Sequence, residues 1–328
     1  MKAIILFVSL FITLSGCSTQ EEGLRKWKDE NRLKVLSTIA MIDDLVKDVG
    51  GDHISPMTLV RGELDPHSYQ LVKGDDEKIG MADLIFCNGL GLEHGASLRE
   101  SLARNPKAVC LGDLIRKSDP KLILFEQNTP DPHIWMDISV WAKSVPFIVE
   151  ALSEKDPIHA ADYKENGKRL TQKLMNEHTR LRNEMQCVPE EKRYLVTSHD
   201  AFNYFARAYL TTDAEKDEGK GHERFAAPEG LSPESQLSTS DIRYILNHIK
   251  LYNIKIIFPE SNVSQASIRK LINAGNEEKL QLTIAKEPLY GDAMGPPGSE
   301  GDSYLKMIQH NVETFKKLLV ENGICHDQ

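Results

Sequence analysis

The tripeptide Asp-Pro-His occurs twice in the first half of the chain, at Asp65–His67 and at Asp131–His133. Proline fixes its own φ angle and disfavours helical geometry in the residue before it, so each tripeptide presents its imidazole in a defined direction. A third histidine, His199, follows His133 at the same spacing at which His133 follows His67. Because neutral imidazole is a common metal ligand near neutral pH, the repetition predicts a metal ion held by residues that are distant in sequence.

Three histidines leave a fourth coordination position that an oxygen ligand would fill. Two carboxylates follow predicted strands in the second half of the chain and are candidates for this position. Asp292 stands between Gly291 and Ala293 in a turn-prone loop, and Glu260 follows the apolar run 254–258. Glu260 can instead orient a ligating histidine through a hydrogen bond. Each residue also has a purely structural interpretation, since a single histidine after a strand is more often structural than a ligand and an aspartate in a turn commonly bonds its own backbone. Both carboxylates therefore stay candidates.

Alternating apolar strands and amphipathic helices position the first of these residues. In the first half, strands are predicted at 34–41, 54–60, 82–87 and 108–111, with helices at 42–50, 75–80 and 93–104 between them. This alternation is typical of a parallel, doubly wound α/β lobe, whose ligands gather outside the carboxyl ends of the strands. His67 lies in the loop that follows the second predicted strand, which is consistent with a ligand role.

A long helix is predicted between two such halves. Residues 158–186 contain no proline, and Leu170, Leu174, His178 and Leu181 recur at helical spacing on one side. A helix of that length spans roughly 40 Å and would join the lobes as a stiff strut. Beyond it, strands are predicted at 193–197, 254–258 and 280–285, and the polar segment 211–235 is predicted to be a surface loop.

The first residues indicate export. A short basic start precedes an apolar run that is too short to cross a membrane and is typical of a signal peptide. Leu14-Ser15-Gly16-Cys17 resembles the lipobox of bacterial lipoproteins, which implies cleavage before Cys17 and lipid attachment to it. The alternative is an ordinary signal peptide with an incidental cysteine. We divide the chain into a signal peptide (1–16), a lipidated tether (17–31), an N-terminal lobe (32–155), a connecting helix (156–187) and a C-terminal lobe (188–328).

Composition and cysteine content exclude several classes of protein. The chain has 328 residues, 40% of them hydrophobic, and a formal net charge of −9, which argues against a nucleic-acid partner because phosphate binding needs a basic face. Four cysteines follow Cys17, namely Cys87, Cys110, Cys187 and Cys325. None forms a Cys-x-x-Cys pair, so a thiolate zinc site is not expected. Disulfides within each half are possible, and buried free thiols are at least as plausible for Cys87 and Cys110.

Taken together, these motifs resemble the metal receptors of bacterial ABC importers, the TroA-like solute-binding lipoproteins for manganese, zinc and iron. The resemblance covers the whole mature chain and rests on both Asp-Pro-His motifs, on 196–205, on Leu231–Glu234, on 258–261 and on Leu289–Gly295. It implies two α/β lobes joined by one long, rigid backbone helix, with the metal buried between them. It also implies His67, His133, His199 and Asp292 as the ligands, with Glu260 left as a residue that supports a histidine.

Two departures from the family pattern concern the choice of metal. Zinc-specific members often carry a long loop rich in histidine and acidic residues, which this chain lacks, and many manganese receptors have glutamate where this chain has His199. Three nitrogens and one carboxylate suit zinc without excluding manganese or ferrous iron. If Asp292 binds through both oxygens, the coordination number rises and the preference for tetrahedral zinc weakens.

The resulting hypothesis is a monomeric, non-enzymatic receptor, lipid-anchored at Cys17 outside the cytoplasmic membrane, in the periplasm or at the cell surface. It would capture one divalent transition metal ion, Zn, Mn or Fe, and deliver it to an ABC permease. One alternative is a surface adhesin whose metal is only structural. Another is a zinc hydrolase, but four protein ligands leave little room for a reactive water, and no His-Glu-x-x-His helix occurs.

Overall fold

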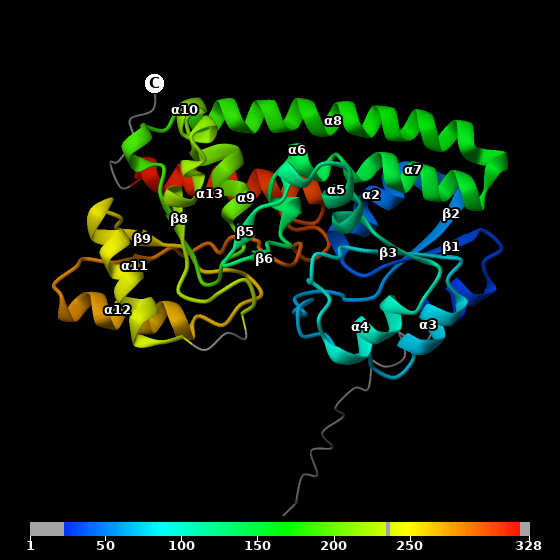
Figure 1. Ribbon diagram of the computed structural model, residues 1–328, viewed down its shortest axis with the longest axis horizontal. Coiled ribbons are helices and arrows are strands. Elements are labelled where there is room, and N and C mark those ends of the chain that lie inside the picture. Colours follow the sequence, from blue (N-terminus) through cyan, green and yellow to red (C-terminus); the bar gives the residue numbers. More distant parts are fainter. Residues whose placement is uncertain (1–22, 234–236, 322–328) are drawn as a thin grey trace, which may run out of the picture.

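The computed structural model describes residues 23–233 and 237–321, and it has two α/β lobes side by side beneath one long helix (Figure 1). The N-terminal lobe contains a four-stranded parallel sheet in the order β2-β1-β3-β4. Its strands are β1 Leu33–Ser37, β2 Ile54–Thr58, β3 Leu84–Cys87 and β4 Ala108–Cys110. The expected α/β organisation with a connecting helix is confirmed.

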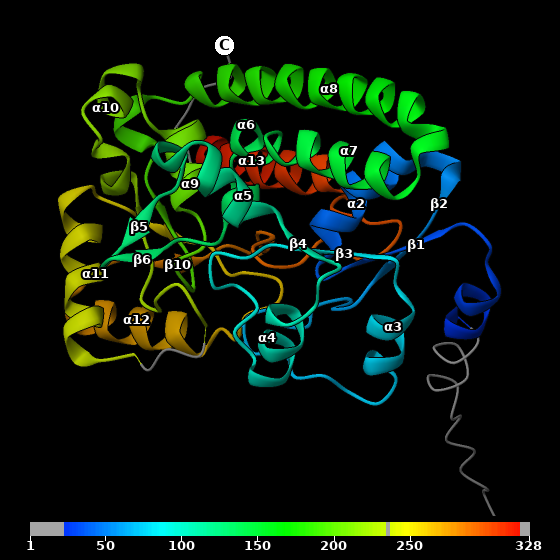
Figure 2. The same cartoon turned by 45° about the vertical axis from the view of Figure 1, so that its right-hand side comes forward.

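Helices cover both faces of this sheet. In both views, α3 and α4 lie on the outer face, whereas α2, α5 and α7 lie on the face toward the long helix (Figures 1 and 2). The helices of this lobe are α2 Ala40–Gly50, α3 Asp75–Met81, α4 Ala96–Ala103, α5 Leu111–Ser118, α6 Ile138–Trp141 and α7 Ser144–Lys155. The strand expected at 34–41 ends at Ser37 because α2 already begins at Ala40.

The connecting helix is α8, Ala160–Gln186, which has 27 residues and is therefore about 40 Å long. It begins slightly later than expected because Pro157–His159 form a short 3-10 turn (η4) before it. Its buried stripe consists of Tyr163, Gly167, Leu170, Leu174, His178, Leu181 and Met185. A second helix, α13 Tyr304–Glu321, runs beneath α8 and packs against both α8 and α2 (Figure 2), so the last helix of the chain also reaches the N-terminal lobe.

The C-terminal lobe has shorter strands than the sequence predicts. Parallel pairs join β7 Leu195–Val196 to β8 Phe225–Ala226, and β9 Ile256–Ile257 to β10 Thr283–Ile284. Its helices, besides α13, are α9 Asn203–Phe205, a π-helical turn (η6) Ala206–Leu210, α10 Asp213–Asp217, α11 Thr239–Leu251 and α12 Ala266–Glu277. Hydrogen-bonded sheet therefore contributes less to this lobe than to the N-terminal one.

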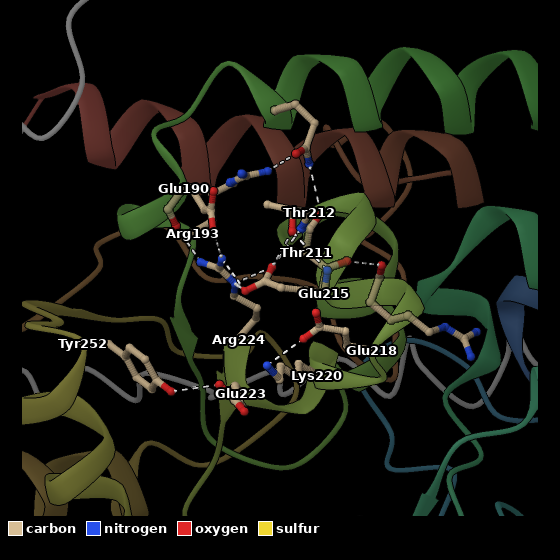
Figure 3. A network of polar contacts seen from close by, with 12 residues as sticks. Glu190, Arg193, Thr211, Thr212, Glu215, Glu218, Lys220, Glu223, Arg224 and Tyr252 are labelled. Carbon is tan, nitrogen blue, oxygen red and sulfur yellow. Dashed lines mark hydrogen bonds and ion pairs between the residues drawn. The ribbon is translucent and has the colours of Figure 1, made fainter.

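The segment 211–235 was expected to be a surface loop, and this expectation is wrong for much of it. It contains α10, a 3-10 turn (η7) Lys220–Arg224 and strand β8. Arg224 is only 1% exposed and lies at the centre of a polar network with Glu215 and Glu190 (Figure 3). The opposite charges of these side chains allow a polar segment to fold inward.

The later part of the segment predicted as a tether, 17–31, contacts the N-terminal lobe in the structure. Residues 23–29 are helical, and Trp27 is only 4% exposed because it packs beside Leu36 and Met57. Its indole N–H donates to the carbonyl oxygen of Ser55 at 2.8 Å. This part of the chain is therefore attached to the N-terminal lobe. The predicted signal peptide and Cys17 lie outside the described residues.

The structure shows the oxidation state of three of the four cysteines that follow Cys17. Cys87 and Cys110 form a disulfide between β3 and β4, so free thiols at these positions are excluded. Cys187 is an exposed free thiol, and Cys325 lies outside the described residues.

One buried apolar cluster runs through both lobes and both long helices. Among its members are Val35, Trp135, Leu174, Phe258 and Phe315, and two smaller clusters lie in the outer parts of the N-terminal and C-terminal lobes. A continuous core limits how far the lobes can separate, since separation would expose apolar surface. Within the described ranges, no helix combines the length and the apolar character that a membrane span requires.

Candidate metal centre

His67 is held by the aspartate that precedes it. Asp65 Oδ1 accepts the backbone N–H of His67 at 2.8 Å, and its Oδ2 accepts the Ser68 hydroxyl at 2.5 Å. This turn follows β2 and brings the imidazole to the junction of the lobes, where His67 is 2% exposed. The Asp-Pro-His tripeptide therefore directs its histidine through a side-chain-to-backbone hydrogen bond as well as through proline.

His133 is oriented in the same way, with an additional contact to its ring. Asp131 Oδ1 accepts the backbone N–H of His133 at 2.9 Å and lies 2.7 Å from its ring Nδ1. With Nδ1 donating to this carboxylate, Nε2 is left with a lone pair that faces the other histidines. Asn203, from the C-terminal lobe, donates to Asp131 Oδ2 at 3.1 Å.

His199 follows β7 and is held by Glu260. Glu260 Oε1 accepts the backbone N–H groups of Ser198 and His199 at 2.9 and 2.8 Å, and its Oε2 lies 2.6 Å from His199 Nδ1. Asp292 approaches from the loop before α13. Gly291, which precedes Asp292, gives Glu260 room, because a Cβ at this position would lie 2.5 Å from Glu260 Oε2 and displace the carboxylate.

The structure brings His67, His133, His199 and Asp292 together, and their potential ligand atoms all lie within 4.8 Å of one another. The Nε2 atoms of His67 and His133 are 3.2 Å apart. Asp292 Oδ2 lies 3.4 Å from His67 Nε2 and 3.1 Å from His199 Nε2, and Oδ1 lies 3.4 Å from His133 Nε2. These separations are of the size expected around one transition metal ion, whose bonds to nitrogen and oxygen are about 2.0–2.2 Å long.

Burial leaves the carboxylate of Asp292 without ordinary partners. All four side chains are buried, and neither oxygen of Asp292 accepts a hydrogen bond from the described residues. A buried charge without such bonds is costly unless it is paired or binds a metal. Both oxygens instead face imidazole nitrogens, as expected of a cation site.

The electrostatics of the centre follow from burial and from close charges. Burial alone would raise the pKa of Asp292, but His199 and His67 hold it well below its usual value. Burial alone would lower the pKa of His199, but Glu260 and Asp292 raise it well above its usual value. Without metal, a proton on His199 therefore compensates the negative charge around it.

Some residues of this centre were not singled out from the sequence. Asp131 is the first residue of the second Asp-Pro-His motif, but the sequence analysis did not predict its contact with His133 Nδ1. Glu93 accepts from Thr38 Oγ1 at 2.7 Å and from the backbone N–H of Asn88 at 2.7 Å, and Asn88 Nδ2 donates to the Pro132 carbonyl at 3.0 Å. The position of Asp131 two residues before the histidine was the available signal, whereas nothing local indicates Glu93. Glu260 lies beside His199 and outside the four-residue group.

Comparison with known proteins adds independent information. The family model described as "Zinc-uptake complex component A periplasmic" (ZnuA) matches residues 35–318. The metal-binding protein YtgA of Chlamydia trachomatis is 38% identical over 319 residues, covering 97% of this chain and 94% of that protein. The manganese-binding lipoprotein MntA of Bacillus subtilis is 32% identical, covering 97% of this chain and 98% of that protein.

Two relatives also have similar solved structures. The crystal structure of Fe(III)-bound YtgA from Chlamydia trachomatis matches with a TM-score of 0.82 at 39% identity, covering 88% of this chain and 98% of that chain. The periplasmic zinc-binding protein TroA of Treponema pallidum matches with a TM-score of 0.78 at 30% identity, covering 88% of this chain and 99% of that chain. The chain is therefore similar to these relatives in both sequence and fold over most of its length.

Proposed function

The chain belongs to the ZnuA family of metal-uptake proteins, and we propose that His67, His133, His199 and Asp292 bind the metal ion that it carries. The family comprises solute-binding receptors of ABC metal importers rather than enzymes, which agrees with the receptor hypothesis and not with the adhesin or zinc hydrolase alternatives. The observation that carries the assignment of ligands is the convergence of these four buried side chains from separate loops of both lobes.

The orientation of Asp292 supports a specific kind of cargo. Its Oδ1 and Oδ2 both lie within 3.4 Å of imidazole nitrogens, so three nitrogens and two oxygens can approach one ion. Iron and manganese accept more than four ligands readily, whereas protein-bound zinc prefers four in a tetrahedron. We therefore propose iron or manganese as the cargo that this geometry favours, with zinc as a competitor whose intrinsic affinity is high.

Localisation and partners follow from the same family membership. Relatives that are named as lipoproteins of metal ABC transporters support an extracytoplasmic, membrane-attached receptor. We propose that lipid is attached at Cys17, that the protein works as a monomer, and that the partner is an ABC permease. Replacement of Cys17 by Ala should abolish incorporation of a radiolabelled fatty acid and release the protein from membranes, and persistent labelling would contradict the anchor.

The domain boundaries remain part of the proposal. Residues 32–155 and 188–328 would act as lobes that carry two ligands each, joined by 156–187, with Asn203 from one lobe contacting Asp131 in the other. A small rotation of one lobe would open the centre, while the shared core limits its extent.

A competitive titration tests the ligands and the metal together. The soluble chain that begins after Cys17 would be titrated in metal-free form with zinc, manganese and ferrous iron, as wild type and as His199→Glu and Asp292→Asn. We expect one ion per chain, tighter relative binding of manganese in His199→Glu, and preferential loss of iron and manganese binding in Asp292→Asn. His222→Ala, which changes an exposed histidine outside the centre, is the matched control.

Acidification provides a second test of the same assignment. Protons compete with metal for imidazole nitrogen, so occupancy should fall well before pH 4.5, which lies about two pH units below the ordinary histidine pKa. Occupancy that stays unchanged at pH 4.5 would remove the histidines from the ligand set. Failure of all three metals to bind at neutral pH would overturn the proposed function.

A further inference from the structure

Trp135 connects the loops that carry His133 and Asp292. It lies two residues after His133, and its indole N–H donates to the carbonyl oxygen of Gly291 at 3.0 Å. Gly291 directly precedes Asp292. One hydrogen bond therefore joins the neighbourhood of a ligand in the N-terminal lobe to the neighbourhood of a ligand in the C-terminal lobe.

Tyr304 extends this connection to the start of α13. Its hydroxyl donates to the carbonyl oxygen of Trp135 at 2.7 Å, and its backbone N–H donates to Asp44 Oδ2 at 3.0 Å. Asp44 belongs to α2 of the N-terminal lobe, so the other lobe satisfies a backbone donor at the beginning of α13. The amino-terminal N–H groups of a helix have no partner within the helix and are well satisfied by a carboxylate.

Aromatic packing surrounds these hydrogen bonds. Trp135 and Tyr304 are completely buried, and Trp141 lies between them, with ring centroids 6.4 Å from Trp135 and 6.2 Å from Tyr304. The Trp135 ring also meets the His133 ring edge-on at 5.4 Å. Because the site is buried, breaking the hydrogen bond from Trp135 or from Tyr304 would leave a buried donor and acceptor unpaired, which is costly.

The loop after Asp292 lines a groove against α2 and β2. Met294, Pro296 and Pro297 form one wall of this groove, whose volume is about 480 Å³. Contact between this wall and the N-terminal lobe is therefore incomplete. Hydrogen bonds at Gly291 and at Tyr304 hold the two ends of the loop.

We propose that Asp44, Trp135, Gly291 and Tyr304 form an inter-lobe latch that presets the distance between His133 and Asp292. Trp135, Tyr304 and Asp44 are positioning residues that do not contact the ion. By holding the Asp292 loop close to His133, the latch keeps both carboxylate oxygens directed at the ion and thereby favours metals with more than four ligands. This inference rests on the proposed function, since it concerns selectivity at the same centre.

The test compares two tyrosine variants. Tyr304→Phe removes the hydroxyl that binds the Trp135 carbonyl, whereas Tyr163→Phe removes a hydroxyl of another buried tyrosine, which donates to Asp156 at 2.7 Å near the distant start of α8. Wild type and both variants would be loaded with Co(II), whose visible absorption reports coordination geometry, and titrated competitively with Mn(II) and Zn(II). Thermal unfolding of the metal-free forms would be recorded in parallel.

For Tyr304→Phe we expect a changed Co(II) spectrum and a Mn(II)-to-Zn(II) affinity ratio lowered by about tenfold, the usual scale for residues that orient metal ligands. Tyr163→Phe should lower thermal stability without changing the spectrum or the ratio. If the two variants share wild-type spectra and ratios, the latch has no role in selectivity. If wild type itself binds none of the three ions, the proposed function fails, which is a different result.

Variants of Asp44 provide a second measurement should Tyr304→Phe fold poorly. Asp44→Ala removes the acceptor for the Tyr304 backbone N–H, whereas Asp44→Asn keeps an acceptor oxygen at that position. The Mn(II)-to-Zn(II) ratio should fall in Asp44→Ala and lie between this variant and wild type in Asp44→Asn. An unchanged ratio in Asp44→Ala would overturn the contribution of Asp44.

Discussion

The two ends of α8 are joined to their lobes by different chemistry. Near its start, the helix packs so closely on α7 that a Cβ at Gly167 would lie 2.4 Å from Val149 Cγ2. Near its end, Arg182 donates to the Ala208 carbonyl at 2.6 Å and pairs with Asp213 Oδ1 at 2.6 Å, and Gln186 donates to the Tyr209 carbonyl at 2.9 Å. Close apolar packing against α7 thus contributes near the start of α8, and hydrogen bonds from Arg182 and Gln186 contribute near its end.

The two lobes also differ in how much sheet and how many charged contacts stabilise them. The N-terminal lobe has a four-stranded sheet with a disulfide between β3 and β4. The C-terminal lobe has strand pairs of two residues each, and Arg224 ties its polar segment together through Glu215 and Glu190 (Figure 3). Burial and the neighbouring charge of Arg224 lower the pKa of Arg193, so even like charges lie close together there.

This difference indicates how the two halves of the metal centre are maintained. His67 and His133 belong to a lobe held by sheet hydrogen bonds and apolar packing. His199 and Asp292 belong to a lobe that has an apolar core of its own and, in addition, a network of charged side chains around Arg224. Glu190 in this network is largely exposed, and interactions of exposed charges weaken with salt. Adjustments of the centre should therefore arise mainly in the C-terminal lobe.

The largest effect is expected from Arg224. It is fully buried, its guanidinium lies 2.6 Å from Glu215 Oε1, and it stacks on Tyr194 at 4.5 Å from the ring centroid. Arg224→Ala should lower the free energy of unfolding by about 4 kcal/mol, because it removes a buried side chain together with its charge-assisted hydrogen bonds to Glu215 and to the Glu190 carbonyl oxygen. Urea unfolding measures this loss.

Arg180→Ala is the matched control for Arg224→Ala. Arg180 pairs with Glu177 and Glu184 on the exposed face of α8, and exposed pairs contribute less than about 1 kcal/mol. Equal losses in the two variants would show that the buried network does not hold the C-terminal lobe together.

The next effect concerns the N-terminal lobe. The disulfide between Cys87 and Cys110 joins residues 23 positions apart, and closing a loop of that length is worth about 3 kcal/mol through the unfolded state. We expect the double variant Cys87→Ala/Cys110→Ala to lose that amount in urea unfolding, while Cys187→Ala, at an exposed free thiol, changes little. A double variant as stable as wild type would show that the sheet alone holds the lobe.

Local patterns in the sequence predict the first half of the centre better than its surroundings. Asp-Pro-His contains both the turn and the carboxylate that orients the histidine, so His67 and His133 could be selected from neighbouring residues. Residue patterns alone left both Asp292 and Glu260 as candidates, and only the family resemblance favoured Asp292. In the structure, Asp292 lies among the imidazoles and Glu260 beside His199 Nδ1, and such proximity is not a local property of the sequence.

The features that stayed undecided or were predicted wrongly have a related cause. The disulfide requires β3 and β4 to be neighbours with Cys87 opposite Cys110, and strand order is not a local property. The polar segment 211–226 folds because Glu215 both caps α10 through Thr212 and pairs with Arg224, which composition alone does not reveal. Likewise, Trp27 is a single aromatic residue in a polar run, yet together with Leu24 it packs that run against the N-terminal lobe.

Acid should weaken the C-terminal lobe through His248. Burial, opposed only by the charge of Glu223, lowers the pKa of His248 to about 4. Since an unfolded histidine titrates near 6.5, the unfolded state binds more protons between about pH 6.5 and 4, and stability falls as the pH falls through this window. The contribution of His248 to this loss should be about 2 kcal/mol at pH 5 relative to pH 7, measured as the difference between wild type and His248→Gln in urea unfolding of metal-free protein. His248→Gln should reduce this pH dependence, and an unchanged profile would assign it to other groups.

The smallest effect tests the close-packed junction. Alanine favours helix over glycine by about 1 kcal/mol, but a Cβ at Gly167 collides with Val149 Cγ2, and overpacking costs about 1–3 kcal/mol. Gly167→Ala should therefore lower stability by about 1 kcal/mol in urea unfolding. In the Val149→Ala background the collision is absent, so the same change should become stabilising. A stabilising Gly167→Ala in the wild-type background would mean that α7 yields easily, and the N-terminal junction would then be no more rigid than the polar junction at the other end of α8.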